Sequence, residues 1–92
     1  MSAQPLSPAQ GGTLSLFSLR NGQAGEIVAL AQTTDAERAT LLRLVELGFV
    51  PGETVRVVAK AFPGGHPLAV RLGNTTFALR RHEAELIHVT GK

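Results

Sequence analysis

Residues 35–47 carry the one long run of apolar positions at helical spacing. Apolar and charged side chains recur there with a period near 3.6 residues, which is typical of an amphipathic helix. The apolar side of this predicted helix consists of Leu41, Leu42, Leu44, Val45 and Leu47. The charged side consists of Glu37, Arg38, Arg43 and Glu46. We therefore expect one helix whose apolar stripe packs against the core.

Both ends of this helix carry residues with known preferences for helix ends. Thr34 and Glu37 have the spacing of a capping box, in which the hydroxyl accepts the Glu37 N–H and the carboxylate reaches back to the cap. Gly48 can adopt the left-handed conformation that ends a helix, and Pro51 cannot continue one. The chain is therefore expected to turn sharply after residue 47.

The rest of the chain has the alternating pattern of short strands. In the stretch after the helix, Val55, Val57, Ala59 and Ala61 fall on one side, which we expect to face the core. Further along, Gly73-Asn74 separates two alternating runs by two residues, as in a β-hairpin. Five strands are expected, at residues 25–31, 54–61, 68–72, 75–79 and 86–89.

These elements predict a fold that is mostly β with one inserted helix, as a small, partly open barrel. Residues 13–92 are expected to form one domain, because a chain of 92 residues has room for one hydrophobic core. Residues 1–12 show no periodicity and are expected to form a mobile tail. Residues 62–67 hold two glycines and two prolines and are expected to form an irregular loop. A single helical turn is expected at 81–85.

Four segments carry a resemblance to a known family through their order and spacing. They are Leu47-Gly48-Phe49-Val50-Pro51-Gly52, Pro67-Leu68-Ala69-Val70-Arg71, Phe77-Ala78-Leu79-Arg80-Arg81 and Ile87-His88-Val89. Over residues 14–89 the chain resembles the ferrous iron transport protein A (FeoA) family of small bacterial cytoplasmic proteins. The resemblance implies an SH3-like five-stranded barrel with a structural corner at Leu47, Gly48, Phe49, Pro51 and Gly52. It also implies a partner, FeoB, the inner-membrane ferrous iron transporter with a cytoplasmic G-protein domain.

Composition removes several classes of function. The chain has no cysteine, which excludes disulfides, thiolate metal sites and iron–sulfur clusters. No apolar run approaches the ~20 residues of a membrane-spanning helix, and the N-terminus lacks the basic and apolar regions of a signal peptide. We therefore expect a cytoplasmic protein without membrane insertion. Since no nucleophile with a base, carboxylate pair or phosphate loop is apparent, we do not expect an enzyme.

Charge is distributed unevenly, although the formal net charge is only +2. Between Thr54 and His82 there are five basic residues and no acidic one. This asymmetry favours an acidic protein partner, nucleic acid or an anionic membrane surface, whereas a solvated basic face is the plainer interpretation. Nucleic acid is the less favoured partner, because the chain has no Trp or Tyr and Phe62 alone is placed to stack on bases.

A metal-sensing module is a further alternative. Barrels similar to the FeoA fold occur as carboxy-terminal domains of metal-dependent transcriptional repressors. Because neither a winged-helix domain nor a dimerisation domain precedes the barrel in this sequence, we expect a free-standing FeoA-like protein and not a repressor fragment.

Candidate metal ligands cluster near the C-terminus. His82, Glu83, Glu85 and His88 carry imidazole and carboxylate groups of the kind that Fe²⁺ or Zn²⁺ accepts. Their spacing is not that of a closed metal site, and chance proximity of surface residues is the favoured explanation. We expect no required cofactor and at most weak binding of a divalent metal.

The expected partner surface combines the 62–67 loop with the end of the last hairpin strand. Loops carry contacts that a rigid scaffold positions, and an exposed aromatic ring is a common anchor. The predicted contact residues are Phe62, Pro63, His66, Pro67, Arg80 and Arg81. An alternative is that Phe62 folds back as a plug over the open end of the barrel. The sequence leaves open whether the protein forms a homodimer.

Overall fold

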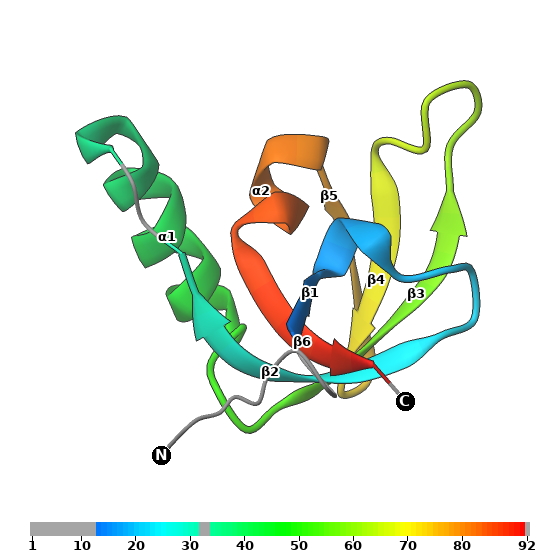
Figure 1. The fold of residues 1–92 in the computed structure, drawn as a ribbon, viewed down its shortest axis with the longest axis horizontal. Coiled ribbons are helices and arrows are strands. Elements are labelled where there is room, and N and C mark those ends of the chain that lie inside the picture. Colours follow the sequence, from blue (N-terminus) through cyan, green and yellow to red (C-terminus); the bar gives the residue numbers. More distant parts are fainter. Residues whose placement is uncertain (1–12, 32–33, 92) are drawn as a thin grey trace, which may run out of the picture.

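The computed structural model describes residues 13–31 and 34–91. The predicted mobile tail at residues 1–12 lies outside them. Six antiparallel strands form a single strongly curved sheet in the order β1-β6-β2-β3-β4-β5 (Figure 1). The strands are β1 Thr13–Ser15, β2 Ala24–Leu30, β3 Thr54–Lys60, β4 Leu68–Leu72, β5 Thr75–Leu79 and β6 Ile87–Gly91. The helices are η1 Leu16–Ser18, α1 Asp35–Leu47 and α2 Arg81–Glu85.

The sheet has one strand more than the five that were predicted. The additional strand, β1, pairs with β6 and leads directly into η1, where Leu16 is fully buried. Three residues are too few to show an alternating pattern, so this strand carries no recognisable signal in the sequence. Because β1 and β5 stand at opposite ends of the strand order, the sheet is open rather than a closed barrel.

The core lies on the concave side of the sheet. Its largest fully buried side chain is Phe49, whose ring meets Phe77 edge to face with centroids 5.2 Å apart. The other fully buried side chains come from η1, α1 and the strands; they are Leu16, Leu19, Ile27, Leu44, Val55, Val57, Leu68, Val70, Leu79, Ile87 and Val89. Thus nearly every element contributes to one small core.

The structure confirms that Thr34 caps the start of α1 and that Gly48 ends it. The Thr34 hydroxyl accepts the Glu37 N–H at 3.1 Å, which caps the first turn. Gly48 ends the helix in the left-handed conformation with φ +112°, and its N–H donates to the carbonyls of Leu44 and Val45. The chain turns there into the buried Phe49 and then the Pro51-Gly52 turn, so the corner is structural.

The apolar stripe of α1 is narrower than predicted. Leu41 and Leu44 are buried, but Leu42 and Val45 are 58% and 44% exposed, and Leu47 is also exposed. The expectation that all five leucines and valines face the core was wrong. Each residue advances 100° around a helix, and α1 meets the body of the protein along one narrow side only, which leaves the next positions in water (Figure 1).

The predicted alternation of β3 fails in its second half. Val55 and Val57 are buried as expected, but Ala59 and Ala61 are exposed. The pairing of β3 with β4 shifts register between Val57 and Ala59, and a bulge of this kind reverses which side chains face inward. A second irregularity interrupts the pairing of β2 with β6. Bulges increase the local twist, which helps so short a sheet to curl around its core.

The β4–β5 hairpin is confirmed. Leu72 pairs with Thr75 across the two-residue turn, and Gly73 takes φ +61°, a value that favours glycine at the first turn position. Leu68, Val70 and Leu72 are buried as predicted. The chain then enters α2, the predicted single helical turn, which lies beside η1.

Candidate functional site

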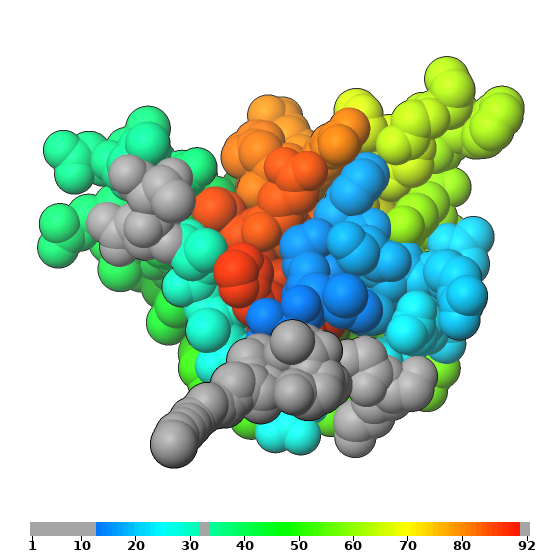
Figure 2. Space-filling model, viewed as in Figure 1, coloured from blue at the N-terminus to red at the C-terminus, as the bar shows by residue number. Residues whose placement is uncertain are grey.

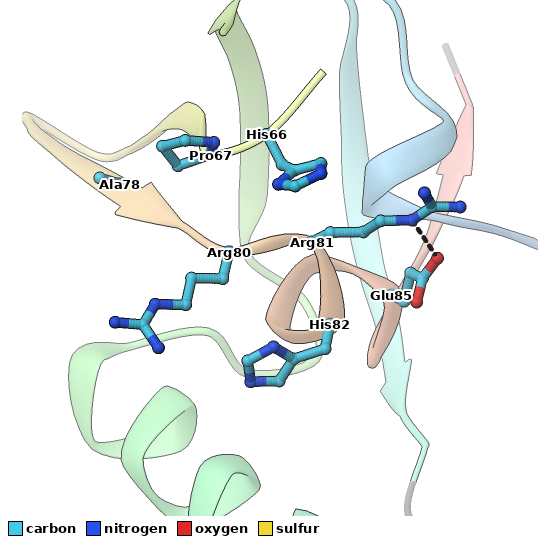
Figure 3. A pocket seen from close by; sticks show the side chains of 7 residues that line it. All are labelled: His66, Pro67, Ala78, Arg80, Arg81, His82 and Glu85. Atoms are coloured by element: carbon cyan, nitrogen blue, oxygen red, sulfur yellow. Dashed lines mark hydrogen bonds and ion pairs between the residues drawn. The ribbon is translucent and has the colours of Figure 1, made fainter. Parts of the chain in front are cut away.

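An open pocket of about 710 Å³ lies where β5 ends and α2 begins (Figure 3). Three separate segments line it: the end of the β3–β4 loop, β5 and α2. The lining residues are His66, Pro67, Ala78, Arg80, Arg81, His82 and Glu85. Four of the six predicted contact residues and two of the four candidate metal ligands therefore lie around one cavity.

Arg80 and Arg81 are neighbours in the sequence, but their side chains diverge (Figure 3). Arg81 is held in place, because its Nε donates to Glu85 Oε2 at 3.0 Å and its guanidinium lies 4.7 Å from the Phe17 ring centroid. No hydrogen bond or ion pair to another described residue holds the Arg80 guanidinium. Arg80 is thus the cation of this pocket that is available to an outside anion.

Two cations, one of them Arg81, gather around the ring of Phe17. Lys60 Nζ lies 5.0 Å from the centroid of the Phe17 ring and donates to the Phe17 carbonyl at 2.8 Å. With Arg81 also near this ring, two cations contact one half-buried aromatic residue. The sequence did not reveal this cluster. Both cations lie more than 40 residues from Phe17 in the chain, so no local pattern indicates it.

The β3–β4 loop projects from the body of the protein (Figures 1 and 2). Its ends are tied by a hydrogen bond from the Ala61 N–H to the Pro67 carbonyl at 3.0 Å. Phe62 is 96% exposed. The ring therefore does not cover the open end of the sheet, and the plug interpretation of Phe62 is wrong. Its role as a contact, together with that of Pro63, stays a prediction.

The four candidate metal ligands are not gathered into one site. His82 and Glu85 share the pocket, but the Glu85 carboxylate is engaged with Arg81. His88 lies on β6, opposite Ser15 and Ala29. Within the described ranges no group of three or more His, Asp or Glu residues is arranged to hold a metal ion.

Glu83 has a structural position that the sequence did not reveal. Its side chain is only 7% exposed, and Oε2 accepts from the Arg43 guanidinium at 2.9 Å. Its Oε1 accepts the Arg80 N–H at 2.8 Å, which caps the first turn of α2. Glu83 therefore links α1 to α2, and both carboxylate oxygens are engaged inside the protein.

The comparisons with known proteins bear on this arrangement directly. The family model described as the FeoA domain matches residues 14–91. The chain belongs to the FeoA family. No curated protein sequence matches the chain. Membership places the chain in ferrous iron transport, among accessory domains that are not themselves catalytic.

Solved structures of FeoA proteins have the same fold as this chain. FeoA of Stenotrophomonas maltophilia, an SH3 domain protein solved in complex with zinc, is 43% identical with a TM-score of 0.73, covering 83% of this chain and 88% of that one. Iron(II) transport protein A from Clostridium thermocellum is 35% identical with a TM-score of 0.70, covering 85% and 45%. The expected SH3-like fold is thereby confirmed, with the sheet left open.

The expected likeness to metal-dependent repressors is also found. A manganese-dependent transcriptional repressor is 25% identical with a TM-score of 0.69, and the match covers 87% of this chain and 42% of the repressor. This likeness concerns the shared domain and does not favour a sensing role over one in transport. None of the helices within residues 13–31 and 34–91 has the length and apolar character needed to cross a membrane.

Proposed function

We propose that this FeoA-family chain is a cytoplasmic, non-enzymatic adaptor that binds the cytoplasmic G-protein region of a FeoB-like ferrous iron transporter. The contact surface consists of Phe62, Pro63, His66, Pro67, Arg80 and Arg81. One observation carries the proposal: the fold brings His66 and Pro67 from one segment to Arg80 and Arg81 from another, around a single open pocket.

The physical character of this surface suits a protein partner. Phe62 offers a large apolar ring that is already free of the core, as anchors of protein interfaces are. Arg80 offers a cation that no described residue neutralises, so an acidic group of the partner can approach it without first breaking an ion pair. None of the six contact residues is acidic, and Glu85, which lines the same pocket, is paired with Arg81.

Such an adaptor acts on the transporter by binding one of its states more tightly than the other. The resulting change in the transporter equilibrium equals the difference between the two binding free energies. Coupling free energies of this kind are typically about 1–3 kcal/mol. No bond needs to be made or broken by the adaptor itself.

The test is the affinity of the purified chain for the cytoplasmic region of the FeoB-like transporter, measured by calorimetry. Arg80→Glu and Phe62→Ala are each expected to weaken binding at least about tenfold, as loss of an interface anchor does. Arg38→Glu is the matched control, because it makes the same charge change at an exposed position of α1. Arg81→Glu is a poorer probe, since Arg81 also contacts Glu85 and Phe17.

The proposal predicts that the control variant binds as the unaltered chain does. If folded Arg80→Glu and Phe62→Ala proteins both bind the transporter region with unchanged affinity, the contact surface is wrongly placed. If the unaltered chain does not bind that region at all, the adaptor function itself fails.

A further inference from the structure

Among the described strands, β5 stands at one end of the sheet and pairs with β4 alone. Leu72 and Thr75 flank a two-residue turn, so their backbone N–H and C=O groups are hydrogen-bonded to each other. Hydrogen-bonded pairs then recur at every second residue of β5. The N–H and C=O groups of Thr76 and Ala78 consequently point away from β4. Both residues are exposed, and no backbone hydrogen bond from another described segment reaches these groups.

This edge lacks the features that usually prevent strand addition. Protected edges are very short, charged, bulged, interrupted by proline or covered. β5 has the sequence Thr-Thr-Phe-Ala-Leu, and its register with β4 shows no shift over all five residues. The opposite edge, β1, has only three residues. β5 is therefore the edge of this sheet that offers a template for another strand.

The surroundings of the edge are basic. Arg71 on β4 lies directly opposite Thr76, and Arg56 on β3 lies opposite Arg71. Two cations therefore lie in line on the two strands next to the edge strand. Thr76, Ala78 and Arg80 share one face, since side chains alternate along a strand. Ala78 and Arg80 also line the open pocket (Figure 3).

We infer that β5 accepts an extended, acidic segment of the partner protein as an added strand. Backbone hydrogen bonds to Thr76 and Ala78 supply the pairing, as in other cases of strand addition. Side chains of the added strand that lie beside Thr76 and Ala78 fall on the face of Arg71 and Arg80, which selects carboxylates at alternate positions. The residue between them lies beside half-buried Phe77 and is apolar.

The recognised segment thus has the pattern acidic, apolar, acidic in an extended conformation. A second copy of this chain is the other candidate for the edge. Pairing two β5 strands would gather Arg71 and Arg80 of both copies on one face, and like charges on neighbouring strands repel. The charges therefore favour an acidic partner over a dimer.

This inference rests on the proposed function, since the added strand belongs to the same partner. The first test uses a capped peptide of alternating glutamate and valine and amide hydrogen exchange of the unaltered chain. We expect at least tenfold slower exchange at the Thr76 and Ala78 N–H groups. A lysine–valine peptide and a backbone N-methylated glutamate–valine peptide are expected to give no protection.

The second test uses Ala78→Pro, which removes an edge donor and keeps the hydrogen bonds to β4, with Ala78→Ser as the control that keeps the N–H. Ala78→Pro is expected to bind the transporter region at least tenfold more weakly than Ala78→Ser. Absence of peptide protection overturns the inference whether or not Ala78→Pro folds. The inference is also overturned if these two N–H groups are protected without peptide and the protection rises with protein concentration. Such protection would show that a second copy of the chain occupies the edge.

The two proposals fail in different ways. If Arg80→Glu weakens transporter binding while a folded Ala78→Pro binds normally, strand addition is wrong and the adaptor function stands. If the unaltered chain does not bind the transporter region but the acidic peptide still protects Thr76 and Ala78, the edge binds another acidic partner and the adaptor function is wrong.

Discussion

Replacing Glu83 with alanine should destabilise the protein more than its position in a helix of only five residues suggests. The substitution removes the acceptor of the Arg80 N–H and the partner of Arg43 in one step. Loss of an N-terminal cap typically costs about 1 kcal/mol. The ion pair adds about 1 kcal/mol, a value at the upper end for exposed pairs, since Arg43 is 64% exposed while the Glu83 side chain is nearly buried.

The expected loss is therefore about 2 kcal/mol of unfolding free energy. For a domain of this size each kcal/mol lowers the melting temperature by roughly 4–8 °C, so Glu83→Ala should lower it by roughly 8–16 °C in a thermal melt followed by circular dichroism. Glu83→Gln should lose about half as much, because the amide oxygen can still accept the Arg80 N–H. Glu85→Ala is the matched control; its exposed pair with Arg81 contributes only about 0.3–0.5 kcal/mol.

A double-mutant cycle with Arg43→Ala separates the two contributions. The coupling between residues 43 and 83 should be about 1 kcal/mol, and the rest of the loss should belong to the cap alone. A melting temperature for Glu83→Ala no lower than that of Glu85→Ala would show that the link between α1 and α2 is not stabilising.

Three further perturbations follow from the described geometry. Gly48→Val should lower stability by more than about 1 kcal/mol in denaturant unfolding, because Gly48 has φ +112° and an added Cβ would lie 3.1 Å from Leu72 Cδ2; an unchanged midpoint would contradict the helix-ending role. Phe62→Ala should leave the melting temperature within about 2 °C, since the ring is almost wholly exposed, and a larger fall would mean that the ring packs on the fold. Calorimetric titration with Zn²⁺ or Fe²⁺ should show only weak binding that disappears in His82→Ala or Glu85→Ala, whereas a submicromolar site that survives both would place the metal elsewhere.

Sequence patterns predicted the parts of this fold that depend on local chemistry. The start and end of α1 depend on Thr34 and Gly48, whose preferences act within one helical turn. The β4–β5 hairpin likewise depends on a two-residue turn between alternating strands. In both cases the residues that determine the geometry are neighbours in the chain, so the helix ends and the turn can be predicted without knowledge of the tertiary structure.

The features that escaped prediction depend on distant residues. The exposure of Leu42 and Val45 follows from how far the body of the protein extends along α1, and the bulge after Val57 follows from the register of β3 with β4. The engagement of Glu83 by Arg43 joins residues 40 positions apart. None of these long-range contacts changes the periodic pattern of apolar residues in the sequence. Periodicity alone therefore cannot show which apolar residues are exposed or where a bulge lies.

The sequence predicted that some residues of the loop and of the strand end lie close together, but not how their side chains are arranged. Grouping a basic strand end with a Gly/Pro loop placed His66, Pro67, Arg80 and Arg81 in one set, and the fold brings them around one pocket. The sequence shows only two adjacent arginines. It does not show that Arg81 is paired with Glu85 while the Arg80 guanidinium is left for an outside anion.

The hydrogen bond between Ala61 and Pro67 closes the base of the β3–β4 loop, so the core does not depend on the tip of the loop. Strands β3 and β4 fix the separation of its ends, and Phe62, Pro63 and Gly64 between them are all exposed. Substitutions at the exposed positions of this loop should therefore leave the core undisturbed, except at Gly64 and Gly65, whose φ values of +91° and +83° favour glycine. Under the proposed function, relatives can differ in partner preference through a few residues of this loop, and exchanging the loop between two relatives should transfer that preference.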